Sequence, residues 1–234
     1  MSEKQYRVAV VGGAGMWGRN YLQAFAQRAD CSVVLVDPSD RAREFAGHFG
    51  VSEVLDNLEA LLKRETPDIV ANILPVRLSH DAVIACAEAG VKAVSCEKPM
   101  AVELSVADEM VRVCQERGTA FGCATAYWEV PFLQECAQWL REGHIGQLKA
   151  VSIPGGLPRE VSGAGCVQLT QMRLVTGMEV KWVEGWVLPP ELGWTLPDGA
   201  KEYEIDCPAY GRLGLSGGLV CDIPAPREES RVHC

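Results

Sequence analysis

The stretch from Val8 to Gly18, VAVVGGAGMWG, constrains the fold of this chain more than any other. A short apolar run breaks into glycines and continues into a helix-forming sequence, which predicts a strand, a tight turn and a helix over 16–29. Gly13, Gly15 and Gly18 fit G-x-G-x-x-G: the first glycine permits the turn, the second lets a pyrophosphate approach the backbone, and the third lets the helix pack on the strand. Glycine-rich turns also occur in purely structural loops, so this motif alone is a weak signal.

The residues after this helix favour dinucleotide binding. A second apolar run over 32–36 ends in Asp37, at the position where an acid holds the ribose hydroxyls of NAD. Met16 and Trp17 stand where the helix N-terminus would meet the pyrophosphate, so we include them among the candidate cofactor-binding residues. Arg41 or Arg43 could meet the 2'-phosphate of NADP, but Asp37 would repel that phosphate, so NAD is favoured over NADP.

Strands and helices continue to alternate as far as residue 124. We expect helices over 39–49, 56–64, 79–89 and 105–117, and strands over 69–74, 91–96 and 120–124. Asp56 and Ser79 are the expected N-caps of two of these helices. The alternation predicts an α/β fold, a Rossmann-type doubly wound parallel sheet, for a domain spanning residues 1–124.

Beyond residue 124 the pattern changes. We expect helices over 131–142 and 164–176, and strands over 148–153, 180–188, 202–207, 212–216 and 219–223. Consecutive strands without helices between them predict a mostly antiparallel sheet. Residues 125–234 are therefore expected to form a smaller α+β domain that binds substrate or makes an oligomer contact.

Composition limits the classes of partner. The 234 residues are 48% hydrophobic and 23% charged, as in a globular protein, and the net charge of −9 argues against nucleic acid and anionic membrane surfaces. No apolar run is long enough to span a membrane, and the polar start of the chain is not a signal peptide, so we expect a cytoplasmic protein. The ten cysteines include no C-x-x-C pair and are interpreted as reduced core residues, with no metal site.

These features together resemble the Gfo/Idh/MocA family, the group of glucose-fructose oxidoreductase and inositol dehydrogenase. The matching residues, over about 6–150, are the three glycines, Asp37, Pro75 and His80 in LPVRLSH, the triplet Glu97-Lys98-Pro99, and EGHIGQL at 142–148. The resemblance implies an NAD(P)-binding Rossmann domain and hydride exchange between nicotinamide and a small substrate. It also implies a homodimer formed through the open sheet of the second domain.

The sequence departs from the family where acid–base chemistry is expected. The family usually carries a histidine and an aspartate on a helix of the second domain, and here Val167 and Thr170 stand at those positions. Neither side chain acts as a base near neutral pH. The second domain is also shorter than is usual in the family.

Several residues of the first domain are candidates for the site. Lys98 follows a strand end next to the implied nicotinamide position, where it could serve as a general acid or as a charged orienting donor. Glu97 is either its partner or a structural carboxylate. Pro75 and His80 follow the preceding strand, and we expect His80 to cap a helix or face the cofactor.

Further candidates lie where the chain enters the second domain. Tyr127 is the alternative proton donor, and Trp128 would contact substrate, although both could simply pack in the core. Gln168 and Gln171 lie on the helix that, by the resemblance, should face the substrate cleft of the family. They could hydrogen-bond a substrate, or could form an ordinary exposed helix face.

Three functions are compatible with these residues. The first is an NAD(P)-dependent oxidoreductase in which Lys98, with Tyr127 as auxiliary, supplies a proton during reduction of a carbonyl, an imine or an activated alkene. The second is a catalytically inactive dinucleotide-binding sensor or partner subunit, which the missing histidine favours. The third is an NAD-assisted redox-neutral reaction, such as elimination or epimerisation.

Overall fold

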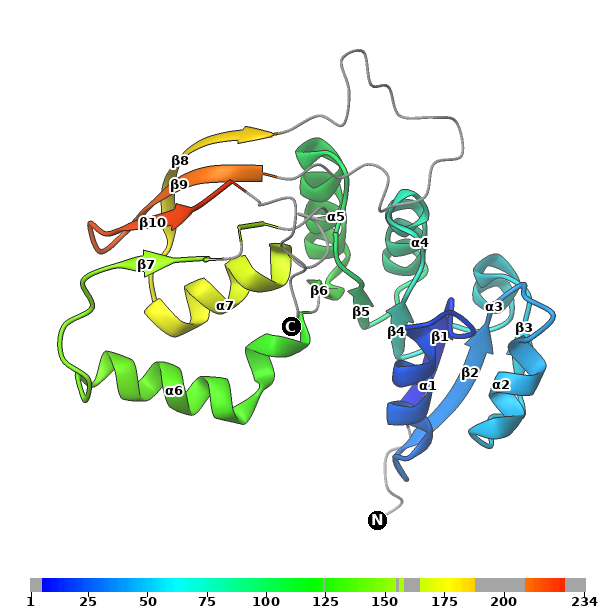
Figure 1. Ribbon diagram of the computed structural model, residues 1–234. Helices are drawn as coiled ribbons and strands as arrows, with labels where there is room; N and C mark the ends of the chain where they lie inside the picture. The colour runs from blue at the N-terminus through cyan, green and yellow to red at the C-terminus, as the bar shows by residue number, and fades with distance from the viewer. Residues whose placement is uncertain (1–5, 124, 155, 158–164, 188–208, 226–234) are drawn as a thin grey trace. The chain divides into compact units, whose positions relative to one another are not determined.

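The computed structural model of the protein describes residues 6–123, 125–154, 156–157, 165–187 and 209–225 (Figure 1). The chain divides into two compact units, Met1–Ala124 (unit 1) and Thr125–Cys234 (unit 2). Over the described ranges, none of the helices has the length and apolar character required to cross a bilayer.

Unit 1 is built on a six-stranded sheet in which every pairing is parallel. Its strands are β1 (Tyr6–Val11), β2 (Cys31–Val36), β3 (Val54–Leu55), β4 (Ile69–Asn72), β5 (Ala93–Cys96) and β6 (Ala120–Cys123). The spatial order is β3-β2-β1-β4-β5-β6, so the winding direction reverses between β1 and β4. Open α/β sheets bind ligands at that switch point, beyond the carboxyl ends of the strands.

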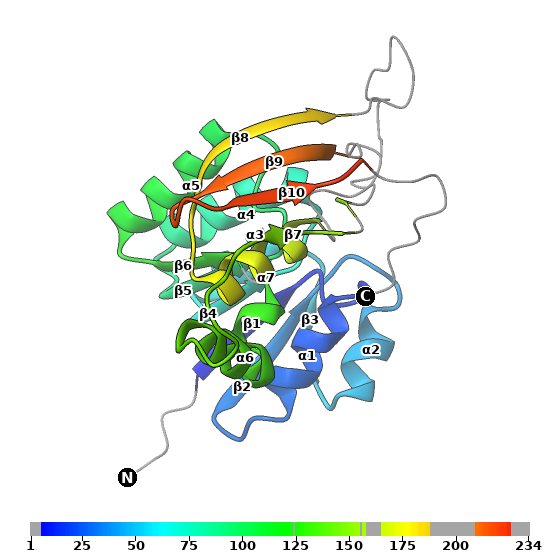
Figure 2. The same cartoon turned by 60° about the vertical axis from the view of Figure 1, so that its left-hand side comes forward.

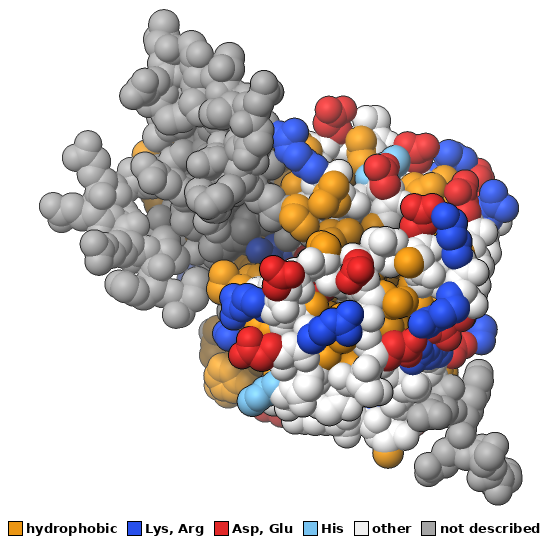
Figure 3. Space-filling view, turned by 90° about the vertical axis from the view of Figure 1, so that its right-hand side faces the viewer, with side chains coloured by type: hydrophobic (Ala, Val, Ile, Leu, Met, Phe, Trp, Pro, Cys, Tyr) orange, Lys and Arg blue, Asp and Glu red, His pale blue; other side chains and the backbone are white. Residues whose placement is uncertain are grey.

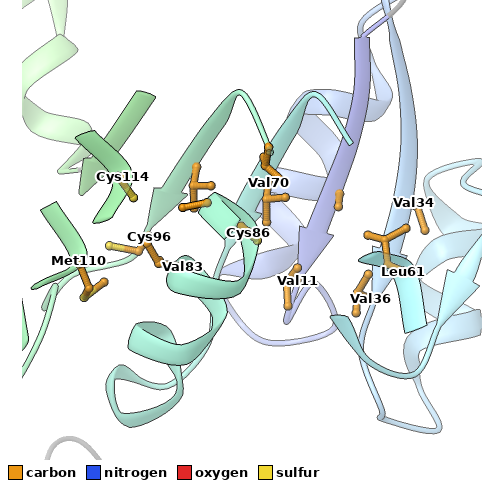
Figure 4. Close-up of a cluster of buried hydrophobic side chains, with 14 residues drawn as sticks. Val11, Val34, Val36, Leu61, Val70, Val83, Cys86, Cys96, Met110 and Cys114 are labelled. Carbon is orange, nitrogen blue, oxygen red and sulfur yellow. The ribbon is translucent and has the colours of Figure 1, made fainter. Parts of the chain in front are cut away.

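Five helices cover both faces of this sheet. They are α1 (Gly18–Ala26), α2 (Ala42–His48), α3 (Leu58–Arg64), α4 (Val76–Glu88) and α5 (Leu104–Arg117). Leu22 of α1 and Ala46 of α2 pack on one face of the sheet. Leu61 of α3, Val83 of α4 and Met110 of α5 pack on the other, and all three are fully buried (Figure 4). The doubly wound fold expected from the alternating pattern is therefore confirmed.

The structure differs from the expected elements mainly at helix starts. The N-cap of α3 is Asn57, whose side chain accepts a hydrogen bond from Ala60 N at 2.8 Å, and not Asp56. Helix α4 begins at Val76, directly after Pro75, so Ser79 lies inside the helix and is not its cap. At α3 the adjacent Asp56 and Asn57 could both serve as the cap, whereas the N-cap of α4 is Pro75, which makes no side-chain capping hydrogen bond.

Unit 2 contains the 3-10 helix η1 (Ala126–Glu129), helices α6 (Pro131–Arg141) and α7 (Cys166–Thr176), and a four-stranded sheet. Its strands are β7 (Val151–Ser152), β8 (Val180–Val187), β9 (Ala209–Leu215) and β10 (Val220–Ile223), in the order β7-β10-β9-β8. The β8–β9 and β9–β10 pairings are antiparallel and β7–β10 is parallel. The strand expected over 202–207 lies outside the described residues.

One face of the unit 2 sheet forms its core. Leu213, Leu215 and Cys221 point from β9 and β10 toward Met172 of α7. Figures 1 and 2 both show α7 on that side of the sheet, with β8, β9 and β10 above it. The opposite face carries the alternate side chains of the same strands.

Charged side chains of both signs are interspersed on the surface of the molecule that Figure 3 shows. Many charged side chains of the described residues form ion pairs. Arg7 of β1 contacts Glu53 and Glu65, the latter at 2.6 Å, and Lys92 lies 2.5 Å from Asp68. The Arg7 pairs hold β1 to the segments that precede β3 and follow α3.

Gly18 is the position where the fold tolerates least change. A Cβ atom there would lie 2.3 Å from Gly12 O and 2.5 Å from Gly13 Cα. Both are backbone atoms that a rotamer change cannot relieve, so we expect Gly18→Ala to lower the free energy of unfolding by about 2–3 kcal/mol. Urea denaturation measures this difference.

Gly47 provides the matched control, because it lies in α2 and a Cβ atom there would meet nothing within 4 Å. Gly47→Ala should raise the free energy of unfolding by about 0.5–1 kcal/mol through helix propensity. A Gly18→Ala protein as stable as the wild type would contradict the close approach of α1 to the turn.

Candidate functional site

The turn after β1 is made by Gly12, a residue that the G-x-G-x-x-G assignment did not include. Gly12 has φ +79°, and a Cβ atom there would lie 2.4 Å from Ile73 O. Gly13, expected to make the turn, instead faces the Leu35 side chain, with Leu35 Cδ1 2.3 Å from the Cβ position. The double glycine after an apolar run is the sequence signal that could have identified Gly12.

Gly15 and the start of α1 form an open backbone surface. The Gly15 Cβ position meets only Gly12 O, at 3.3 Å. Among the described residues no side chain caps α1, and the N–H groups of Arg19 and Asn20 donate to Gly15 O at 3.4 Å and to Trp17 O at 2.9 Å. Met16 is 71% exposed and Trp17 56% exposed beside them. Backbone donors, a helix N-terminus and the absence of a side chain are what an anionic diphosphate requires.

Asp37 lies directly beyond β2 and is bound to the glycine turn. Its Oδ2 accepts a hydrogen bond from Ala14 N, and its Oδ1 accepts one from Ser39 N, both at 2.9 Å. The residue is only 8% exposed. Since a carboxylate oxygen has two lone-pair sites, each oxygen retains capacity for one further donor, such as a ribose hydroxyl.

The segment after β4 forms the other side of the switch point. Ile73 N donates to Val11 O at 2.8 Å, which continues the β1–β4 pairing to the edge of the sheet. Pro75 follows in an extended conformation, φ −48° and ψ 140°, and is exposed. Pro75 thus lies beyond the end of β4, next in the sheet to the strand that leads into the glycine turn.

Glu97 and Lys98 continue from β5 and are both half-buried. Glu97 N donates to Asn72 O at 3.2 Å, and the Glu97 carboxylate accepts hydrogen bonds from Tyr21 Oη at 2.6 Å and Lys98 N at 3.2 Å. Burial, followed by the bond to Glu97, raises the pKa of Tyr21, so the phenol stays protonated and donates. The Lys98–Pro99 peptide bond is cis. Glu97 is therefore held by α1 and β4 together.

Tyr21 was missed by the sequence analysis. It lies on α1, 76 residues away from Glu97 along the chain, and no local spacing signals such a contact. A tyrosine on an amphipathic helix predicts only core packing, and Tyr21 does pack partly against the cluster around Leu22.

His80 bridges two helices. Its Nδ1 lies 2.8 Å from Asp81 Oδ1, and its Nε2 lies 3.0 Å from Glu109 Oε2 on α5. The hydrogen bond with Asp81 and that with Glu109 outweigh desolvation and raise the pKa of His80. Both ring nitrogens contact carboxylates, and His80 does not cap α4, whose N-cap is Pro75.

The candidate residues of unit 2 lie on two elements in contact with each other, η1 and α7. Trp128 is 39% exposed on η1, whereas the side chain of Tyr127 lies outside the described residues. On α7, Gln171 is half-buried, and Gln168 Oε1 is buried with no hydrogen-bond partner among the described residues.

The two family positions that lack their usual residues also lie on α7. Val167 is half-buried, and Thr170 Oγ1 donates to Cys166 O at 2.8 Å. That bond occupies the Thr170 proton within the helix. Neither side chain is an acid or a base.

The structure thus brings the unit 1 candidates other than His80 to one edge of the parallel sheet. The glycine turn, Asp37, Pro75 and the Glu97–Lys98 pair follow β1, β2, β4 and β5, whose carboxyl ends are neighbours. Trp128, Gln168 and Gln171 belong to unit 2.

Known proteins share both the sequence pattern and the fold. A sequence model described as an oxidoreductase family with an NAD-binding Rossmann fold, Gfo/Idh/MocA, matches residues 6–125. D-apiose dehydrogenase of Paraburkholderia graminis is 30% identical over 146 residues. That match covers 61% of this chain but only 38% of the dehydrogenase.

Two solved structures are similar over nearly the whole chain. Myo-inositol 2-dehydrogenase from Lactobacillus plantarum has a TM-score of 0.74 at 17% identity and covers 96% of this chain and 70% of its own. The WlbA dehydrogenase from Bordetella pertussis, in complex with NADH and UDP-GlcNAcA, has a TM-score of 0.76 at 18% identity. The match covers 99% of this chain and 70% of the WlbA chain. At these identities the likeness shows the fold.

The His80 bridge predicts a pH-dependent stability. A raised folded-state pKa contributes stability that is fully present below the unfolded value of about 6.5 and is lost as pH rises through the folded pKa. The loss of unfolding free energy in His80→Gln should therefore be larger at about pH 6 than at about pH 9. Urea denaturation at both values measures it.

His48→Gln is the control. The His48 ring packs edge-on against Phe49 at 5.0 Å, so its loss should lower the free energy of unfolding by the same amount at both pH values. An equal effect of His80→Gln at the two pH values would mean that the His80 ion pairs do not contribute to folding.

Proposed function

This chain belongs to the Gfo/Idh/MocA oxidoreductase family with an NAD-binding Rossmann fold, and on that premise we propose an NAD-dependent hydride transfer as its function. The substrate would be a small carbonyl, imine or hydroxyl compound. The observation that carries the proposal is the open backbone surface of Gly15 at the uncapped start of α1, next to the acceptor Asp37. Together these groups suit a pyrophosphate followed by a ribose.

The residues of unit 1 would divide the dinucleotide among them. The Gly15 N–H donates to Gly12 O, so the backbone N–H groups from Met16 to Gly18 would bind the pyrophosphate over the open backbone of Gly15, with the side chains of Met16 and Trp17 flanking it. Asp37 would accept the ribose hydroxyls, while Pro75 and the Glu97–Lys98 pair would border the nicotinamide half. When bound, the nicotinamide supplies or takes up the hydride.

NAD is proposed over NADP because of the charge and position of Asp37. Its carboxylate is nearly buried and fixed by two backbone N–H groups, so it cannot swing away from a 2'-phosphate. Two negative groups in contact repel, and the repulsion is stronger away from bulk water.

NADH should accordingly bind at least about tenfold more tightly than NADPH. Asp37→Asn keeps the size of the side chain and removes its charge. The ratio of NADH affinity to NADPH affinity should therefore fall, even if the affinities for both nucleotides decrease. Fluorescence titration of each nucleotide measures the ratio. Equal affinities in the wild type would exclude Asp37 as the discriminating group.

Lys98 is the proposed proton donor for the reduction. Its ammonium would give a proton to the oxygen or nitrogen of the substrate as the adjacent carbon receives the hydride. Tyr127 is the auxiliary donor, and Trp128, Gln168 and Gln171 are proposed substrate contacts. The buried, unpartnered Gln168 Oε1 supports a polar ligand near α7. Without a basic residue at Val167 or Thr170, the chain suits reduction better than oxidation of a hydroxyl.

Replacing Lys98 with methionine keeps the aliphatic stem and removes the proton donor. We expect Lys98→Met to retain NADH affinity and to lose turnover by about a hundredfold to ten-thousandfold. Steady-state rates with small aldehydes, ketones and cyclic imines measure it. Near wild-type turnover would exclude Lys98 and favour Tyr127, whereas wild-type protein that binds NADH but reduces nothing would favour a sensor.

A homodimer through the unit 2 sheet is a second proposal. On the face opposite α7, Trp182 and Trp186 of β8 are about half exposed, and Trp186 stacks on Tyr210 of β9 at 5.5 Å. Arg212 pairs with Glu184 between these aromatic rings. Two exposed tryptophans and a half-buried tyrosine around a paired arginine and glutamate suit an isologous contact with a second copy.

Trp186→Glu would place a charge among the aromatic rings of this face, so we expect a dimer to become a monomer. Sedimentation velocity measures the mass, with Leu104→Glu, at a site in unit 1 that is 84% exposed, as the control. A wild-type monomer, or a dimer that survives Trp186→Glu, would contradict the proposal.

A further inference from the structure

Glu97 is fixed by its backbone before its side chain is considered. Its N–H donates to Asn72 O at 3.2 Å, and its carbonyl accepts from Cys123 Sγ at 3.7 Å. The residue therefore stays in register with β4 and β6 beyond the last ladder pair of β5. Only its side chain remains to be oriented.

Two side chains in this region could bind the Glu97 carboxylate. One is the phenol of Tyr21, which binds Oε1 at 2.6 Å, and the other is the ammonium of the adjacent Lys98. The lysine ion pairs in the described part of the chain are Lys63–Glu59 and Lys92–Asp68, and Lys98 Nζ forms none. The carboxylate has thus taken the phenol and a backbone N–H in place of its neighbour's ammonium.

The other titratable groups beside this pair are two thiols. Cys96 and Cys123 are register partners at the ends of β5 and β6. The hydrogen bond between them raises the pKa of the Cys96 thiol, to which burial adds, so Cys96 remains neutral. The same hydrogen bond lowers the pKa of the Cys123 thiol against the effect of burial, and the charge of Lys98 adds to the lowering. Glu97 is the carboxylate next to Lys98 in the chain, and its side chain is the one that could neutralise the ammonium.

We propose that Tyr21 is a positioning residue that holds the Glu97 carboxylate away from Lys98 Nζ and so keeps the Lys98 ammonium free. This inference rests on the proposed function, because a free ammonium is what a proton donor next to the cofactor requires. The proposal gives α1 a second role besides binding the pyrophosphate. The helix that begins at the glycine turn would also set the state of the lysine at the end of β5.

The test compares the reactivity of Lys98 in five proteins, using trace acetylation by acetic anhydride and mass spectrometry of the Lys98 peptide. An ion-paired ammonium gives up its proton less readily and is acetylated more slowly. In Tyr21→Phe, Glu97 is released to Lys98, so we expect Lys98 labelling to slow by about twofold to fivefold, the range for a partly exposed ion pair.

A second substitution separates pairing from other effects. Glu97→Gln removes the charge, so Lys98 labelling in Tyr21→Phe/Glu97→Gln should return to the rate of Glu97→Gln alone. Tyr6→Phe, at the amino end of β1 and so at the other end of the strands from Glu97, should leave the wild-type rate unchanged. Loss of fold would expose Lys98 and speed labelling, which is the opposite direction.

Unchanged or faster labelling in Tyr21→Phe would overturn the proposal, as would slowing that persists in the double variant. The labelling needs neither nucleotide nor substrate. Its failure is therefore distinguishable from failure of the proposed function, which the NADH titrations and the turnover of Lys98→Met decide.

Discussion

The contact between Gly18 and the backbone of Gly12 and Gly13 is the constraint on which the candidate site depends. With no Cβ atom at Gly18, α1 begins directly against the turn, and its uncapped N-terminus stays next to the open surface of Gly15. The same closeness brings Tyr21, one helical turn further on, to the end of β5. One backbone approach therefore positions both the anion-binding surface and the Tyr21 phenol that binds the Glu97 side chain.

The sequence predicts the fold well where its signals are local. Alternating apolar runs and helical segments predicted the parallel sheet, and Gly118 ends α5 in a left-handed conformation, as its position after a helical run suggests. Strand β3, at two residues, is too short to produce a periodic pattern, and it was missed. Helix starts with several possible caps, as at Asn57, depend on packing that the sequence does not display.

The candidate site was predictable only in part, for the same reason. A motif with fixed spacing located Gly15 and Asp37, but the hydrogen bonds of Asp37 to the turn are contacts of the folded chain. His80 matches the family by position, yet Glu109 on another helix determines what its ring does. Partners distant in sequence change the role of a residue without changing the motif in which it stands.

The open backbone at Gly15 is the proposed dinucleotide site, and calorimetric titration of NADH into Gly15→Val tests that assignment most directly. A Cβ atom there would lie 3.3 Å from Gly12 O, a tight contact that a small shift of the turn relieves, so the variant should fold and show no measurable NADH binding, while the wild type binds. Undiminished binding of NADH by a folded Gly15→Val protein would contradict the claim and leave the glycines as a structural turn.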